Sequence, residues 1–364
     1  MYYVPFLSLE NIHKEKPPIQ IPCHFFKNNY EVQLIVGKND GPKYKWTKIN
    51  ETLNVHNNGM INKKLSSHLN EFFQAFGIVR NYNPDLMIFH GNYPTSLLIA
   101  FFLKIFNLFH LTKRSKLILK LDWDGRLIDY PRTLRLAYSL VLFLSFLIYD
   151  KVSIETECGL TNLQNFPHPS SRFLLIPNTI SDKYFPLKPN ISKERENIIL
   201  TVSRIMESKK IDILIRLFIE VNKILPNWKL VIVGPVIDGN YQKKLDLLVN
   251  ESGSIKNSIL FTGRLFGDDL EEYYKKASIF CLLSQGESFA LARHEAIASG
   301  IPVLTSLAAC GVKLRGALSV SINDFDKLKE SLLKLMLDKY LRQSLVEEGQ
   351  QNLLKWDEII KLFM

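Results

Sequence analysis

The sequence predicts an α/β protein built from two doubly wound domains, and three observations support this prediction. Its 364 residues suffice for two domains of ordinary size. Short apolar runs, typical of buried parallel strands, alternate with longer stretches of helical periodicity. Between two such series, residues 182–197 are rich in Pro, Lys and Glu and poor in apolar side chains. We therefore expect a first domain at 1–185, a linker at 186–197, a second domain at 198–345 and a final helix at 346–364.

The first half contains apolar runs that we interpret as buried strands. These expected strands lie at residues 2–9, 31–36, 85–89, 117–121, 151–156 and 173–176. Apolar residues recur at helical spacing over residues 65–82, which predicts a helix there. Residues 19–28 fit a short helix or a loop, and residues 47–64 are too polar to assign.

Polar residues follow two of these strands. His90 comes after the strand at 85–89, and Asp122 and Asp124 come after the strand at 117–121. Ligands of parallel sheets bind at the carboxyl ends of the strands, so these side chains are candidate site residues. The alternatives are a structural histidine, which is the commoner role of a lone His, and an Asx turn before Gly125.

Two helical stretches, residues 96–110 and 136–149, are unusually apolar. Neither reaches the roughly 20 apolar residues needed to span a bilayer. Basic residues lie near them, namely Lys113, Arg114, Lys116, Arg126, Arg132 and Arg135. Core helices with a solvated basic rim would explain this pattern, as would peripheral contact with an anionic membrane. We predict the peripheral membrane contact.

The second half opens with a strand at 198–202, followed by Arg204 and Lys209 just before a helix that ends at Asn222. Between the end of a strand and the start of a helix, a planar Arg guanidinium and a Lys ammonium can donate hydrogen bonds to the oxygens of a diphosphate. The alternative is a pair of solvated loop cations. Further strands are expected at 230–233, 259–262, 279–283 and from 303, and further helices at 268–277, 325–337 and 341–352.

The stretch SQGESFALARHEAIASGIPVL, residues 284–304, organises the second half. It follows a buried strand and predicts a helix from Phe289 to Ser299, with Ser288 as candidate N-cap and Gly300 as its left-handed end. Unpaired backbone N–H groups at such a helix start bind phosphate. Glu287 lies in the turn and Glu295 lies eight residues later, where both carboxylates can accept hydrogen bonds from sugar hydroxyls. Alternatively, Glu287 stabilises the helix dipole and Glu295 is solvated.

This stretch resembles the E-x7-E motif of the GT-B family 4 glycosyltransferases, also known as glycosyl transferases group 1. Residues 287–291 match its E-G-F-G-L and residues 295–303 match its E-A-M-A-x-G-x-P-V, although Ser288 and Ala290 replace the two glycines. Arg204 and Lys209 match the family's R-x4-K, with Lys210 in place of the following glycine.

Other segments resemble the family more weakly. Residues 177–180 match its P-N-G-V turn with Thr in place of Gly, and residues 355–359 resemble its terminal helix, which crosses back to the first domain. The family's glycine-rich loop after the first strand is missing, since no glycine precedes Gly37. At residues 122–124 the chain has Asp-Trp-Asp where the family often has a His-Asp pair.

The resemblance implies a GT-B fold, with two Rossmann-like domains facing a cleft and the C-terminal helix returning to the first. It implies transfer of a hexose-type sugar, with retention, from a nucleotide-diphosphate sugar to a glycan or a polyprenyl-linked or other lipid-linked acceptor. Neither a metal nor another cofactor is expected. The implied catalytic residues are Glu287, Arg204, Lys209 and Asp122. The implied donor-binding residues are Glu295, Ser288, Phe289, Ala290, Leu291 and Gly311. The implied acceptor-side residues are His90 and Asp124.

Composition and charge limit the other classes of function. The net charge of +10 favours an anionic partner, but the cations form no long block, so we expect no nucleic acid partner. The four cysteines form no CxxC or CxxH pair, which argues against a zinc site, and Cys281 is expected to be a buried, reduced thiol. The N-terminus does not have the pattern of a signal peptide, which predicts a cytoplasmic protein acting at the inner face of the membrane.

Two further hypotheses remain from the sequence. Another GT-B enzyme, such as a sugar-nucleotide epimerase, would share the fold but lack this set of motifs. A non-catalytic protein that binds sugar nucleotides or glycans at a membrane surface would explain the missing glycine loop and the replaced glycines.

Overall fold

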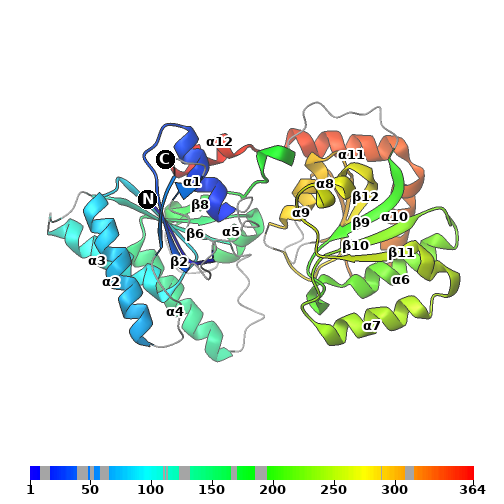
Figure 1. The fold of residues 1–364 in the computed structure, drawn as a ribbon, viewed down its shortest axis with the longest axis horizontal. Helices are drawn as coiled ribbons and strands as arrows, with labels where there is room; N and C mark the ends of the chain where they lie inside the picture. Colours follow the sequence, from blue (N-terminus) through cyan, green and yellow to red (C-terminus); the bar gives the residue numbers. More distant parts are fainter. Residues whose placement is uncertain are drawn as a thin grey trace. The chain divides into compact units, whose positions relative to one another are not determined.

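A computed structural model describes residues 1–8, 17–38, 48–49, 53–57, 65–109, 111, 114–122, 132–164, 170–184, 195–287, 289–307 and 315–364. These residues form two compact units, Met1–Thr179 with Lys355–Met364, and Ile180–Leu354. Each unit is built around its own sheet with helices on both faces (Figure 1). The doubly wound α/β architecture predicted from the sequence is therefore confirmed.

The first unit has one mainly parallel sheet with the strand order β3-β4-β2-β1-β5-β6-β7-β8. Its strands are β1 (Tyr2–Ser8), β2 (Gln33–Lys38), β3 (Lys48–Ile49), β4 (Leu53–Asn57), β5 (Leu86–His90), β6 (Lys116–Leu121), β7 (Lys151–Ile154) and β8 (Phe173–Leu175). Every neighbouring pair is parallel except β3 with β4. In this register His90 lies beside Lys120, and Leu121 lies beside Ile154. The carboxyl ends of β5, β6 and β7 therefore share one edge.

Helices cover both faces of this sheet. They are α1 (Pro17–Lys27), α2 (Leu65–Tyr82), α3 (Pro94–Leu108), α4 (Arg132–Ile148), α5 (Glu157–Gln164) and α12 (Trp356–Ile359). Leu117 and Leu119 pack with α2, α3 and α4, whereas Ile118 packs with α1 and α12 on the opposite face, as period-two alternation requires. Figure 1 shows α2, α3 and α4 together on one side, with α1 and α12 on the other.

The second unit has a fully parallel sheet with the strand order β11-β10-β9-β12-β13-β14. Its strands are β9 (Glu196–Val202), β10 (Lys229–Val233), β11 (Ile259–Gly263), β12 (Ala277–Leu282), β13 (Val303–Ser306) and β14 (Ala317–Val320). Its helices are α6 (Ile211–Asn222), α7 (Gly239–Asn250), α8 (Gly267–Lys276), α9 (Leu291–Ala298), α10 (Phe325–Leu337) and α11 (Lys339–Gln351). Both faces are covered, which explains why β9, β10 and β12 read as continuous apolar runs.

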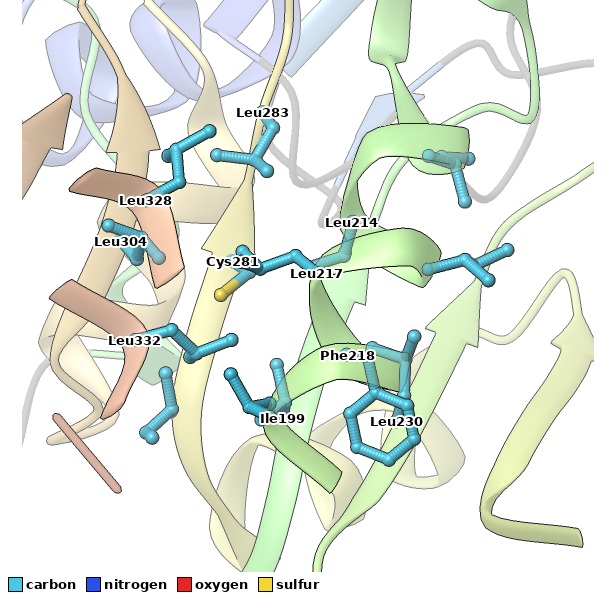
Figure 2. Packing of buried hydrophobic residues seen from close by; sticks show 14 of the residues in the cluster. Ile199, Leu214, Leu217, Phe218, Leu230, Cys281, Leu283, Leu304, Leu328 and Leu332 are labelled. Atoms are coloured by element: carbon cyan, nitrogen blue, oxygen red, sulfur yellow. The ribbon is translucent and has the colours of Figure 1, made fainter. Parts of the chain in front are cut away.

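One core cluster of the second unit lies between the sheet and α6, α7 and α10. Figure 2 shows Cys281 of β12 at its centre, between Leu217 of α6 and Leu332 of α10. Cys281 is a buried free thiol, as its apolar strand predicted. A second cluster lies on the other face and includes Tyr274 of α8 and Ala296 of α9. The two clusters fix the carboxyl ends of β9, β12 and β13 relative to α9.

The units divide at other places than the sequence suggested. Ile180 and Tyr184 belong to the second unit, because both pack in the cluster that contains Tyr274. The returning segment starts at Lys355 rather than at residue 346. Residues up to 351 remain in α11, where a side chain at Gly349 would meet Ile297 of α9 at 2.6 Å, so α11 and α9 pack closely.

Sequence reasoning did not assign several elements. The structure has β3 and β4 in the unassigned polar stretch, and it has α5, α7 and β14, for which no prediction was made. The predicted helix at 289–299 begins only at Leu291, because Ala290 has a left-handed backbone with φ 54° and ψ 70°. Gly300 ends this helix in a left-handed conformation with φ 78°, as predicted.

The two unusually apolar stretches form α3 and α4. Among the described residues, no helix is long and apolar enough to cross a membrane. Both helices bury one side against the sheet through residues such as Leu103 and Phe146.

Candidate active site

The structure brings Lys209 and Glu287 together at one end of the second sheet. The Lys209 Nζ atom lies 2.5 Å from Glu287 Oε1, and both side chains are mostly buried. The hydroxyl of Ser284 donates to the same carboxylate oxygen at 2.9 Å. The backbone N–H of Gln285 donates to the carbonyl of Ser208 at 2.9 Å, so the two loops are also joined by their backbones. The predicted cation and the predicted carboxylate thus belong to one site.

Arg204 lies in the turn after β9, which packs against the turn after β10. The backbone N–H of Ile205 donates to the carbonyl of Pro235 at 2.9 Å. A Cβ atom at Gly234 would lie 1.8 Å from the Ser203 carbonyl oxygen, so only glycine permits this close approach. The Arg204 side chain is exposed, and within the described part of the chain it has neither a hydrogen bond nor an ion pair. Its guanidinium is therefore available to an anion.

Two residues that replace family glycines keep a backbone conformation that glycine prefers. Lys210 has φ 47° and ψ 41°, directly before α6, and Ala290 has φ 54° and ψ 70°, directly before α9. A left-handed conformation costs an L-residue roughly 1–2 kcal/mol. Both loops therefore hold a non-glycine residue in a left-handed conformation at an energetic cost.

We predict that Ala290→Gly stabilises the protein. Glycine relieves the left-handed strain but adds entropy to the unfolded chain, so a net gain of about 0.5–1 kcal/mol is expected. Urea unfolding of the second unit measures it. The control is Ala292→Gly, which lies inside α9 and should destabilise by about 1 kcal/mol. Equal losses for the two variants would contradict the strain argument.

Glu295 and the neighbouring candidates have defined positions. Tyr274 of α8 is fully buried, and its hydroxyl donates to Glu295 Oε2 at 2.9 Å, which orients that carboxylate. Burial and then the charge of Glu295 raise the pKa of Tyr274 well above its usual value, so the hydroxyl keeps its proton. The ring of Phe289 stacks on His294 at a centroid distance of 3.9 Å, and Leu291 begins α9. Ser288, Gly311 and Asp124 lie outside the described residues.

Sequence reasoning missed Arg293 and His294 of α9. Arg293 is only 6% exposed, and its guanidinium donates to Thr305 Oγ1 at 3.3 Å and to the Phe289 carbonyl at 3.2 Å. Burial lowers the pKa of Arg293 to about 10, against the opposing charge of Glu287. Burial and then the charge of Arg293 lower the pKa of His294 to about 3, so the imidazole is neutral at neutral pH. The sequence signal was a run of three consecutive polar residues, Arg293, His294 and Glu295, in an otherwise apolar helix.

The first unit has a buried polar cluster at the carboxyl ends of β5, β6 and β7. His90 Nε2 lies 2.6 Å from Asp122 Oδ2, and the Lys120 ammonium donates to Asp122 Oδ1 at 2.8 Å. The Tyr2 hydroxyl lies 2.5 Å from His90 Nδ1. Lys120 also lies 3.5 Å from Glu155 Oε1. The His–Asp pair that is missing along the sequence therefore forms in space, from two neighbouring strands.

The cluster keeps Asp122 ionised. Burial alone would raise the pKa of Asp122, but the charges of His90 and Lys120 outweigh it and hold that pKa well below its usual value. Burial lowers the pKa of Lys120, but Asp122 and Glu155 together raise it above its usual value. The side chain of Asp122 is 39% exposed, whereas Lys120 and Glu155 are almost completely buried. Asp122 is thus the part of the cluster that an incoming molecule can reach.

No group of three or more His, Cys, Asp or Glu side chains suited to a metal ion occurs among the described residues. Asp122 has the Lys120 ammonium and the His90 imidazole as its described partners.

Comparisons with known proteins show which families and structures this chain resembles. Residues 186–352 match the family model described as "Glycosyl transferases group 1". The chain is 25% identical over 300 residues to an uncharacterized glycosyltransferase of Haemophilus influenzae, which covers 82% of this chain and 78% of that protein. Over 112 residues it is 33% identical to the alpha-monoglucosyldiacylglycerol synthase of Streptococcus pneumoniae, covering 31% of this chain and 24% of that protein.

A solved structure matches the whole chain. HepE of Anabaena, in complex with UDP-glucose, superposes with a TM-score of 0.73 at 13% identity and covers 100% of this chain and 97% of that one. At this identity the match establishes the fold alone. The family model, by contrast, covers the part of the chain that contains Arg204, Lys209, Glu287 and Glu295.

Proposed function

We propose that this chain is a GT-B glycosyltransferase of the group 1 type and that it transfers a hexose-type sugar from a nucleotide-diphosphate sugar to a glycan or lipid-linked acceptor, with retention of configuration. The match of residues 186–352 to the group 1 family model and the GT-B-like fold support this proposal. The observation that supports this most directly is the contact between Lys209 and Glu287 beside the start of α9. This contact would bring a cation suited to a diphosphate next to a carboxylate suited to a sugar.

The second unit would bind the donor. A Lys ammonium has three N–H donors, so Lys209 can contact Glu287 and a phosphate oxygen at the same time. Arg204 would supply a planar donor fork to the same diphosphate, and the N–H groups at the start of α9 would add a positive dipole. These groups stabilise the negative charge that develops on the leaving diphosphate, which is the role a metal ion has in other transferases.

The remaining donor contacts follow from the same placement. Glu287 would accept hydrogen bonds from the sugar, and Glu295, oriented by Tyr274, would accept them from the ribose. Phe289, Ala290 and Leu291 lie between the two carboxylates and would line the donor. Ser288 and Gly311 are proposed for the same role from the sequence alone.

The first unit would bind the acceptor near Asp122. Both oxygens of Asp122 already have partners, the Lys120 ammonium and the His90 imidazole, and its low pKa makes it a poor proton acceptor at neutral pH. We therefore assign it to accepting a hydrogen bond from an acceptor hydroxyl, with His90 holding its orientation. Asp124 is proposed as a second acceptor-side residue from the sequence.

The apolar helices of the first unit support a lipid-linked acceptor and peripheral contact with an anionic membrane at its inner, cytoplasmic face. Leu140, Phe143, Leu144 and Leu147 are spaced along one face of α4 and are 37–61% exposed. The neighbouring α3 exposes Leu98, Phe101 and Leu108 in the same way. The sequence adds cations near both helices, including Arg132 and Arg135 in the first turn of α4.

We predict that Phe143→Glu with Leu147→Glu weakens binding to anionic vesicles about 10- to 100-fold. Each side chain contributes roughly 1.5–3 kcal/mol when fully buried in an apolar phase. Flotation with phosphatidylcholine vesicles, with and without phosphatidylglycerol, measures the binding. Leu247→Glu is the control, because Leu247 is 63% exposed on α7 of the other unit. Equal vesicle binding by all three proteins would exclude this surface.

The transferase is tested with a panel of UDP-, GDP- and ADP-sugars. Thermal shift reports donor binding, and release of free nucleotide in the presence of a membrane lipid extract or soluble glycans reports turnover. Stabilisation by one nucleotide series with acceptor-dependent release supports the proposal and identifies the donor. Binding without release from any acceptor would favour the non-catalytic binding protein, and no binding at all would refute the donor site.

A further inference from the structure

Arg293 is a buried cation for which the described part of the chain provides no anionic partner. Its side chain is 6% exposed, and among the described residues it hydrogen bonds to the Thr305 hydroxyl and the Phe289 carbonyl, while its Nε–H finds no partner there. Within the described part of the chain no carboxylate lies at ion-pair distance from it. A buried charge is costly unless it is paired, so this arrangement lowers the stability of the ligand-free protein.

Arg195, a half-buried arginine of the same unit, differs in this respect. Arg195 donates to the carbonyl oxygens of Tyr274, Lys275 and Ala277 at 2.9, 3.1 and 2.9 Å and also to that of Ser299. Such a set of backbone acceptors is typical of an arginine with a structural role. Arg195 precedes β9 and connects it to the end of α8 and the end of α9. The two contacts of Arg293 are longer and leave part of its donor fork unused, so a purely structural role does not explain it.

The position of Arg293 is that of a ligand-binding residue. It is the third residue of α9, and a helical side chain points back towards the N-terminus of its helix. It reaches Thr305 of β13, whose hydroxyl donates to the carbonyl of Leu282 at the end of β12. This is the carboxyl edge of the sheet, where ligands of such folds bind. Glu287 is close enough for its charge to affect the pKa of Arg293.

We propose that Arg293 is a third cation of the donor site, beside Arg204 and Lys209, and that its guanidinium binds an oxyanion of the nucleotide sugar. This proposal rests on the donor site proposed above. The oxyanion belongs either to the diphosphate or to a carboxylate on the sugar, because the same planar fork recognises both groups. Binding would provide the buried guanidinium with a negative partner, which the described residues do not supply.

The test uses the opposite effects of one substitution on stability and on affinity. Arg293→Met removes the buried charge but keeps the volume, so its Tm should stay the same or rise by about 2–4 °C. Its affinity for the donor should fall about 10- to 100-fold, because charged hydrogen bonds are lost. A merely structural arginine would instead lower the Tm and leave the affinity unchanged.

The control is Arg342→Met. Arg342 donates to the carbonyls of Leu335 and Met336 at the junction of α10 and α11, so its loss should lower the Tm without changing donor affinity. Calorimetric titration of each full-length protein with UDP, UDP-glucose and UDP-glucuronate separates the two sources of the oxyanion. An equal loss for all three ligands assigns Arg293 to the diphosphate, and a loss confined to UDP-glucuronate assigns it to the sugar carboxylate.

Two results would overturn the proposal, and they differ from each other. Wild-type binding of these ligands with unchanged affinities in Arg293→Met would exclude Arg293 and leave the donor site standing. Absence of wild-type binding to every nucleotide sugar of the panel would refute the donor site and this proposal with it.

Discussion

The Lys209→Ala variant is expected to turn over its donor about 10- to 100-fold more slowly than the wild type, with its fold intact. The variant loses charged hydrogen bonds to the diphosphate, each worth about 1.5–3 kcal/mol, at the step where negative charge develops on the leaving group. It also frees Glu287, whose carboxylate lies 2.5 Å from Lys209 in the structure. Nucleotide release at saturating acceptor measures the rate, and circular dichroism checks the fold.

Two further variants separate these contributions. In Lys209→Ala with Glu287→Gln, a rate no lower than that of Glu287→Gln alone would show that Lys209 acts through Glu287 rather than on the diphosphate. The matched control is Lys223→Ala, which removes an exposed cation of the same unit that pairs with Glu220 at 2.6 Å. Equal turnover by Lys209→Ala and Lys223→Ala would refute the diphosphate role.

Much of the fold was predictable from the sequence because both sheets are buried on two faces. Residues 230–233 of β10 and 279–282 of β12 are continuous apolar runs, which few other structures explain. The strands that escaped prediction are short or polar. Lys48–Ile49 has two residues, and Leu53–Asn57 contains three polar ones, so neither has an apolar pattern that distinguishes it from a loop.

The site was predictable only in part. The motif resemblance selected Lys209 and Glu287, but their contact joins residues 78 positions apart and depends on the order of β9 and β12 in the sheet. Lys120 gave a local signal, since it is a charged residue inside the apolar run KLILKL. Its partner Glu155 follows a different strand, and only the register that places Leu121 beside Ile154 brings the two together.

Lys120→Met is expected to destabilise the protein by about 3–5 kcal/mol at neutral pH. The substitution removes the only ammonium that contacts both Asp122 and Glu155 among the described residues. It leaves Glu155 as a buried charge and leaves the 39% exposed Asp122 without its lysine partner. Urea unfolding followed by tryptophan fluorescence measures the loss. Lys104→Met is the matched control, because Lys104 pairs with Asp150 but both side chains are about one-third exposed, so a loss of about 0–1 kcal/mol is expected.

The loss caused by Lys120→Met should also depend on pH with a definite sign. In the wild type the folded-state pKa of Asp122 is depressed, so its contribution to stability is present above the usual value of 3.8 and disappears as the pH falls through the lower, folded-state value. Without Lys120 the pKa of Asp122 rises, so its protonation at mildly acidic pH removes one of the charges that the substitution leaves without a lysine partner. The difference between the two proteins should therefore shrink from about pH 7 to about pH 4. A difference that is constant over this range would show that Lys120 stabilises the fold by packing rather than by charge.

Adding Asp122→Asn and Glu155→Gln to Lys120→Met should restore stability at neutral pH, because no buried charge then remains without a partner.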